Sequence, residues 1–166
     1  MAVPVQTQAR RQREQLLVSQ YVAENYPTGR VMFQQRVGPI PPTVNESGLT
    51  RGQKLALGSF RRVADAVIIL PDKLVIIEGY VHVQLGKLSQ LLTYIELLPM
   101  TPELGKFAAL PVEPMLLGAQ RDPLMDQMAR KFGISTVIYQ PQWVKDYLAT
   151  MDSRKARPRQ HVELSL

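Results

Sequence analysis

The fold is decided by residues 63–81, which read VADAVIILPDKLVIIEGYV. Two runs rich in β-branched residues flank the dipeptide Pro71-Asp72, a combination typical of a β-hairpin with a tight turn. If this dipeptide alone forms the turn, Asp65 pairs with Glu78 on the other strand, with their Cβ atoms about 5 Å apart. Two like charges in that position destabilise a hairpin unless a cation lies between them or one carboxylate binds a proton. The pair therefore predicts a divalent-metal site.

Two other interpretations of these carboxylates remain open from the sequence. A three-residue turn would shift the pairing by one residue and place the carboxylates on opposite faces of the sheet. Asp65 can also be explained as the partner of Arg61 or Arg62 in an ordinary salt bridge.

The composition limits the chemistry that such a site can perform. A chain of 166 residues, 45% of them hydrophobic, is sufficient for one domain with a single sizeable core. The absence of cysteine excludes disulfides, thiolate catalysis and cysteine-based zinc sites. The two histidines, His82 and His161, are far apart in the sequence, which disfavours a histidine-based zinc site or a serine–histidine relay. A metal ion would be held mainly by oxygen ligands, which suits Mg²⁺, Mn²⁺ or Ca²⁺.

The charge distribution favours polyanionic partners. The net charge is +6 and the pI is near 9.8. Basic residues concentrate near the two ends of the chain, namely Arg10, Arg11, Arg13, Arg154, Lys155, Arg157 and Arg159. Solvated termini on an ordinary basic protein explain this distribution equally well. No apolar run predicts a membrane span or a signal peptide, so we expect a protein that is not secreted by that route.

The order of predicted elements favours an α/β domain with a mixed sheet covered by helices. We expect this single domain to span residues 1–151 and a basic tail to span residues 152–166. A long connection at residues 38–58, rich in proline and glycine, is of the kind that is often functional or bound to a partner. The predicted elements are helix 8–25, strand 30–37, hairpin 60–81, helix 85–98, strand 112–118, helix 123–132, strand 134–139 and helix 141–151.

Three motifs resemble those of the PD-(D/E)xK nuclease superfamily, specifically its RecB-like branch. They are Asp65 at one strand, Glu78-Gly79-Tyr80 on the next, and Gln90-x-x-x-Tyr94 on the following helix. The predicted element order agrees with the core of that family from about residue 8 to residue 140. The resemblance implies a restriction-endonuclease-like mixed sheet with a central hairpin flanked by helices.

The resemblance also implies roles for particular residues. Asp65 and Glu78 would bind Mg²⁺, while Gln90 and Tyr94 would help to hold DNA. We expect the arginines of the N-terminal helix, Arg10, Arg11 and Arg13, to contact DNA as well.

One position departs from the family pattern. Tyr80 occupies the place of the catalytic lysine, and a phenol with a pKa of about 10 supplies no fixed positive charge at neutral pH. Some members carry the lysine on the next helix, where Lys87 is the candidate.

Three functions are compatible with these motifs. The missing lysine, the long 38–58 connection and the polar and basic ends favour a catalytically impaired structural or assembly protein, similar to tailed-phage head-completion and neck proteins. Such a protein would contact protein partners through its termini and the 38–58 loop, and also DNA, in the virion or cytoplasm. The alternatives are a Mg²⁺-dependent DNA nuclease with Lys87 as the relocated lysine, and a DNA-binding module without enzymatic activity.

Overall fold

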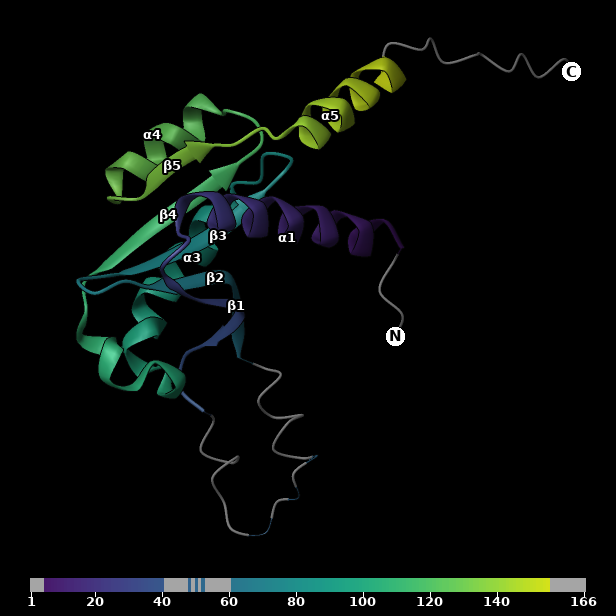
Figure 1. The fold of residues 1–166 in the computed structure, drawn as a ribbon. Coiled ribbons are helices and arrows are strands. Elements are labelled where there is room, and N and C mark those ends of the chain that lie inside the picture. Colours follow the sequence, from purple (N-terminus) through teal and green to yellow (C-terminus); the bar gives the residue numbers. More distant parts are fainter. Residues whose placement is uncertain (1–4, 41–47, 49, 51, 53–60, 156–166) are drawn as a thin grey trace, which may run out of the picture.

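The chain folds into a five-stranded mixed sheet with helices on both faces (Figure 1). The computed structural model describes residues 5–40, 48, 50, 52 and 61–155. This architecture confirms the predicted α/β class and is consistent with a restriction-endonuclease-like sheet. Among the described residues, no helix is long and apolar enough to cross a membrane.

The strands lie in the sheet in the order of the sequence, β1-β2-β3-β4-β5. Strands β1, β2 and β3 pair antiparallel, whereas β3, β4 and β5 pair parallel. The strands are β1 (Arg30–Val37), β2 (Arg62–Ile69), β3 (Leu74–Tyr80), β4 (Val112–Gly118) and β5 (Ser135–Ile138). The central hairpin therefore joins the antiparallel half of the sheet to its parallel half.

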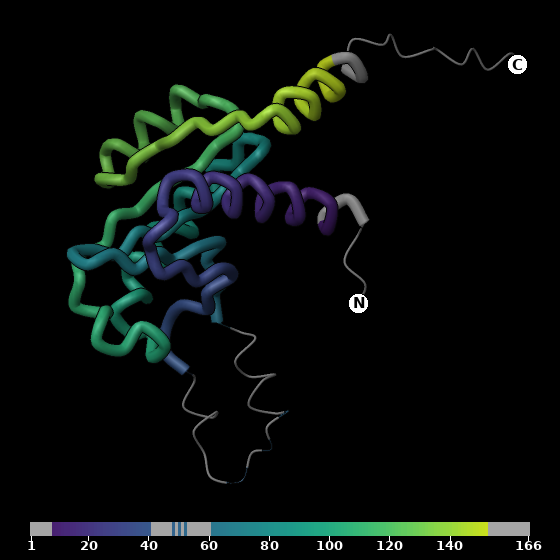
Figure 2. The backbone as a smooth tube through the Cα atoms, viewed as in Figure 1, coloured from purple at the N-terminus to yellow at the C-terminus, as the bar shows by residue number. Residues whose placement is uncertain are grey.

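Two apolar clusters cover the two faces of the sheet. On one face α1 and α5 pack against Ile68, Val75 and Ile77, and on the other α3 and α4 pack against Val67, Ile76 and Leu116. The chain path in Figure 2 shows α1 lying across the sheet and α5 leading away from it. The helices are α1 (Val5–Asn25), α3 (Gly86–Leu97), α4 (Pro123–Lys131) and α5 (Gln142–Lys155), with 3₁₀ segments η2 (Leu98–Met100) and η3 (Pro102–Ala109).

The predicted elements agree closely with the observed ones, with two differences. The segment Pro102–Ala109, for which the sequence predicts no element, forms a 3₁₀ segment interrupted at Gly105, where φ is 46°. Helix α5 continues to Lys155, into the segment predicted as a tail. The rest of that tail, residues 156–166, and most of the 38–58 connection lie outside the described residues.

The hairpin register is the predicted one. The Leu70 N–H donates to the Lys73 carbonyl at 2.9 Å, so the turn consists of Pro71 and Asp72 alone. The last paired residues of the hairpin are Ala66 and Ile77, and just beyond them the Asp65 N–H donates to Oε1 of Glu78 at 3.3 Å, so the two residues are neighbours across the end of the ladder.

The salt-bridge interpretation of Asp65 does not apply to Arg61. Its guanidinium instead pairs with Glu103, with Nη2 2.8 Å from Oε2.

The predicted alternation of β2 breaks at Asp65. Strict alternation would place Ala64 with Ala66 and Ile68, yet Ala64 packs in the opposite cluster together with Val67. On the neighbouring strand Gln34 has a φ of 49°, in the left-handed region that residues other than glycine rarely adopt. The sheet is thus locally irregular at the position of the first carboxylate.

Candidate active site

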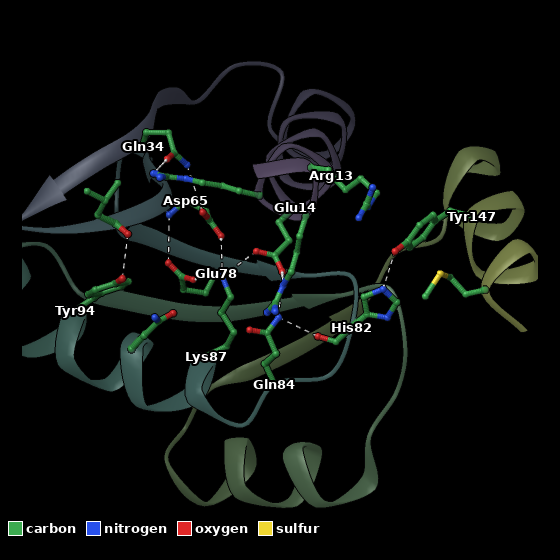
Figure 3. Close-up of a pocket in the computed structure, with 16 residues that line it drawn as sticks. Arg13, Glu14, Gln34, Asp65, Glu78, His82, Gln84, Lys87, Tyr94 and Tyr147 are labelled. Carbon is green, nitrogen blue, oxygen red and sulfur yellow. Dashed lines mark hydrogen bonds and ion pairs between the residues drawn. The ribbon is translucent and has the colours of Figure 1, made fainter. Parts of the chain in front are cut away.

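Two carboxylates occupy the open end of the hairpin, where the backbone pairing stops (Figure 3). The Asp65 N–H donates to Oε1 of Glu78 at 3.3 Å. The Gly79 N–H donates to Oδ2 of Asp65 at 2.9 Å. Each carboxylate therefore accepts a backbone donor from the opposite strand, which holds both side chains in place at the end of the ladder.

Lys87 reaches both carboxylates from the first turn of α3. Its Nζ lies 3.0 Å from Oε2 of Glu78 and 3.7 Å from Oδ2 of Asp65. The helix begins at Gly86, a few residues after β3 ends, and packs against β3. Because this connection is short, Lys87 lies beside the two carboxylates of the hairpin.

Tyr80, the residue two positions after Glu78, belongs to the core. Its side chain is fully buried, and its ring lies so close to Gly118 that a Cβ there would be 2.3 Å from the ring. Its hydroxyl donates to the Gln120 carbonyl at 3.3 Å. Burial, with smaller contributions from the charges of Asp126 and Asp122, raises the pKa of Tyr80 to about 12. Tyr80 fills space above β4 and supplies no charge to the site.

Glu14 of α1 is a third carboxylate that the sequence analysis missed. Its Oε2 lies 3.5 Å from Nζ of Lys87. Its Oε1 accepts from Nε of Arg10 at 3.2 Å and from Nε2 of Gln84 at 3.1 Å. A signal was present, because Glu14 shares the helical spacing of the buried stripe formed by Leu17, Val18, Tyr21 and Val22. A charged residue on that stripe is out of place unless it has a buried partner.

Gly79 allows α1 to approach β3 closely enough to bring Glu14 to the site. A Cβ at this position would lie 2.5 Å from Cγ2 of Val18 and 3.5 Å from the Glu14 carbonyl oxygen. A larger residue would require the Val18 side chain or the helix to shift. The glycine between the second carboxylate and Tyr80 thus has a packing role.

Acidic side chains surround the ammonium of Lys87. Among the described residues, Glu14, Asp65 and Glu78 all lie within ion-pair distance of it, and Glu14 also pairs with Arg10. Burial and the charge of Asp65 raise the pKa of Glu78 to about 8, although Lys87 opposes the rise. Burial alone would lower the pKa of Lys87, but the three carboxylates outweigh it and hold that pKa above its usual value.

The donor set fits a hard divalent cation. Carboxylate oxygens are the preferred ligands of Mg²⁺, and a second cation would offset the burial and the repulsion by Asp65 that together raise the pKa of Glu78. Asp65 and Glu78 are the natural pair of ligands, because Glu14 is engaged by Arg10 and Gln84. In the described part of the chain, no group of three or more acidic, histidine or cysteine side chains is arranged around one metal position. A metal bound here would therefore take its remaining ligands from water, the backbone or the substrate.

A polar cleft of about 850 Å³ opens onto the carboxylates and includes every residue predicted for the site. The three arginines of α1 lie along it. Nη2 of Arg11 donates to Oε1 of Gln34 at 3.0 Å, and the guanidinium of Arg13 lies 4.4 Å from the centre of the Tyr147 ring. Tyr147 in turn is 2.9 Å from Nε2 of His82, at the α5 end of the cleft (Figure 3).

The two residues of the Gln-x-x-x-Tyr motif have different environments. Gln90 is exposed on the cleft. Tyr94 is buried, and its hydroxyl donates to the Val63 carbonyl at 3.0 Å. Burial, together with the charges of Glu78 and Asp65, raises its pKa to about 12. Tyr94 therefore stabilises the start of β2, whereas Gln90 is exposed where it can contact a ligand.

Gln34 is the second residue of the site that the sequence analysis missed. Its Nε2 donates to Oδ1 of Asp65 at 3.3 Å while its Oε1 accepts from Arg11. It therefore links an arginine of α1 to the first carboxylate of the hairpin. Its positive φ is a backbone distortion located at the site, where such distortions commonly concentrate.

We compared the chain with known proteins. No protein-family model, curated protein or solved structure matches the chain.

Proposed function

We propose that this protein is a Mg²⁺-dependent DNA nuclease whose centre consists of Asp65, Glu78 and Lys87. The observation that carries the proposal is the position of Nζ of Lys87, 3.0 Å and 3.7 Å from the two carboxylates. The sequence favours an impaired site because Tyr80 replaces the expected lysine. Lys87 supplies that missing charge from the neighbouring helix, and this geometry supports the nuclease over the assembly protein.

The residues divide the chemistry of phosphodiester hydrolysis among them. Asp65 and Glu78 would hold the Mg²⁺, which when bound supplies a Lewis acid and lowers the pKa of a coordinated water. The ammonium of Lys87 is positioned to orient a water molecule or to stabilise negative charge that develops on the phosphate. Its pKa lies above the usual value, so it stays charged at neutral pH.

The cleft suits an anionic polymer. The chain carries a net charge of +6, and Arg10, Arg11 and Arg13 all line the cleft. Phosphate contacts by arginine provide affinity for DNA that does not depend on sequence. The protein would accordingly bind the DNA backbone on α1 and place one phosphate at the carboxylates.

The assembly role is the second candidate, and it retains part of its support. A role in a particle such as a phage head–tail junction is favoured by the long connection and by the two ends of the chain. Those segments lie mostly outside the described residues. A DNA-binding module without activity is the third candidate, and it would share the same arginines.

The test is cleavage of single-stranded and duplex DNA with Mg²⁺, Mn²⁺ or EDTA. We expect metal-dependent cleavage by the wild-type protein and none by Asp65→Asn or Glu78→Gln. Glu113→Gln is the matched control, because Glu113 is an exposed carboxylate paired with Lys73 away from the cleft.

Each alternative gives its own result in this test. An inert wild-type protein that binds DNA with a steep salt dependence would support the DNA-binding module. An inert wild-type protein that does not bind DNA would favour the assembly role. Cleavage that survives both carboxylate substitutions would show that the activity arises elsewhere or from a contaminant.

A further inference from the structure

A second, apolar cleft lies beside the proposed active site. It has a volume of about 390 Å³ and is lined by Gln15, Leu16, Ser19, Phe33, Gln34 and Asp65. Gln34 and Asp65 line both clefts, so the two are adjacent and Asp65 stands at their boundary. Nothing in the proposed chemistry uses Leu16 or Phe33.

Two large apolar side chains are exposed in this cleft. Phe33 is 50% exposed and Leu16 is 44% exposed. Phe33 pairs with Ala66, which faces α1, so Phe33 lies on the sheet face that α1 covers. The aromatic ring and the leucine thus form an apolar wall directly beside a carboxylate of the site.

We propose that Phe33 and Leu16 form a nucleobase-binding subsite that takes one unstacked base next to the phosphate held at Asp65. This inference rests on the proposed nuclease function. Aromatic side chains bind single-stranded nucleic acid by stacking on bases, and the interaction tolerates any base because each has a π-face. The amide of Gln15 borders the apolar wall, where it can meet the polar edge of a base, and the Ser19 hydroxyl, which donates to the Leu16 carbonyl, keeps its oxygen as an acceptor.

Continuity with the polar cleft identifies a base as the occupant. A nucleotide joins a charged phosphate to a flat, largely apolar ring within one residue of the polymer. The two clefts present the same pair of chemistries side by side, basic and acidic groups in one and an apolar wall in the other. A second copy of the chain that docked here would use the apolar wall alone and would leave its position beside the charged cleft unexplained.

The subsite implies a preference for single-stranded or locally unpaired DNA. A base in an intact duplex is stacked and paired, and exposing it costs a few kcal/mol per base. A single strand bears little of that cost. The protein should therefore bind single strands through both clefts, and duplex DNA mainly through the arginines.

The experiment measures binding without cleavage, in EDTA, so that it stands apart from the activity test. The probe is a short oligothymidylate with a single 2-aminopurine, whose fluorescence is quenched when the base stacks. A duplex of the same length serves for comparison. The variants are Phe33→Ala, Phe33→Leu and Phe33→Trp, and Phe132→Ala is the control. Phe132 is 45% exposed and lies at the end of α4, and it lines neither cleft.

We expect Phe33→Ala to weaken single-strand binding about 5- to 100-fold and to abolish the quenching. Phe33→Leu should retain part of the affinity but lose the quenching, whereas Phe33→Trp should retain both. Duplex binding, and every property of Phe132→Ala, should match the wild type.

Three results would overturn the subsite. They are unchanged single-strand binding in Phe33→Ala, an equal loss for single strands and duplex, and no binding of the probe by the wild type. Sedimentation provides a further check, since a wild-type dimer that Phe33→Ala converts to a monomer would assign the apolar wall to self-association. If the wild type cleaves DNA while any of these results holds, the proposed function stands and the subsite fails. If quenching by Phe33 is found in a protein that does not cleave, the subsite stands without the nuclease.

Discussion

Replacing Glu78 by glutamine should make the metal-free protein more stable at neutral pH. Burial and the neighbouring Asp65 raise the pKa of Glu78 from 4.5 to about 8. The unfolded chain therefore loses this proton at lower pH than the folded protein does, so folding becomes less favourable as the pH rises from about 4.5 to about 8. At pH 7 the accumulated penalty is roughly 3 kcal/mol, taking about 1.4 kcal/mol for each pH unit above the unfolded pKa. Glutamine keeps the shape of the side chain and removes the ionisation.

The assay is urea denaturation in EDTA at several pH values between 5 and 8. The stability of the wild type should fall across this range, whereas that of Glu78→Gln should change much less. The difference between them should grow to about 3 kcal/mol at pH 7. Glu113→Gln, at an exposed surface pair, should follow the wild type throughout.

Two results would contradict a raised pKa of Glu78. One is a Glu78→Gln protein that is less stable than the wild type at pH 7. The other is a difference that does not depend on pH. Either would mean that Glu78 is ionised across the range and that its pair with Lys87 is an ordinary stabilising ion pair.

Three further predictions follow from the same geometry. Mg²⁺ should raise the melting temperature of the wild type but not that of Asp65→Asn, and an equal rise in both would exclude Asp65 as a ligand. Gly79→Ala should destabilise the protein by about 1–3 kcal/mol, because its Cβ would lie 2.5 Å from Cγ2 of Val18. Adding Val18→Ala should recover part of that loss, and a purely additive double variant in urea denaturation would contradict the contact. Tyr94→Phe should cost about 1 kcal/mol, because it removes the hydrogen bond to the part-buried Val63 carbonyl, and unchanged stability would show that water replaces the hydroxyl.

The hairpin and the position of Lys87 beside it could be predicted because both depend on local sequence. A proline–aspartate turn between two β-branched runs specifies the register, and this register brings Asp65 and Glu78 together at the end of the ladder. Helix α3 follows β3 through a short connection, so Lys87 in its first turn must lie close to the end of β3. Helix α4, predicted at residues 123–132, is equally local, because Oδ1 of Asp122 accepts from the Met125 N–H at 2.8 Å and caps its first turn.

The other residues of the site depend on contacts between distant parts of the chain. Glu14 reaches Lys87 only because α1 packs on Gly79, a contact between elements far apart in sequence. Gln34 binds Asp65 from a left-handed backbone conformation that glutamine seldom adopts. The local sequence therefore does not predict its position in the site. The 3₁₀ segment Pro102–Ala109 was missed because it has no sustained helical period and is interrupted at Gly105.

The variant Lys87→Met shows whether Lys87 supplies the charge of a working nuclease centre. The measurement is the rate of Mg²⁺-dependent DNA cleavage by this variant, by the wild type and by Lys73→Met, a lysine paired with Glu113 outside the cleft. We predict that Lys87→Met lowers the rate at least about 100-fold, as expected for loss of a group that stabilises the transition state, while Lys73→Met matches the wild type. An unchanged rate in Lys87→Met, or no cleavage by the wild type with any divalent metal, would contradict the claim.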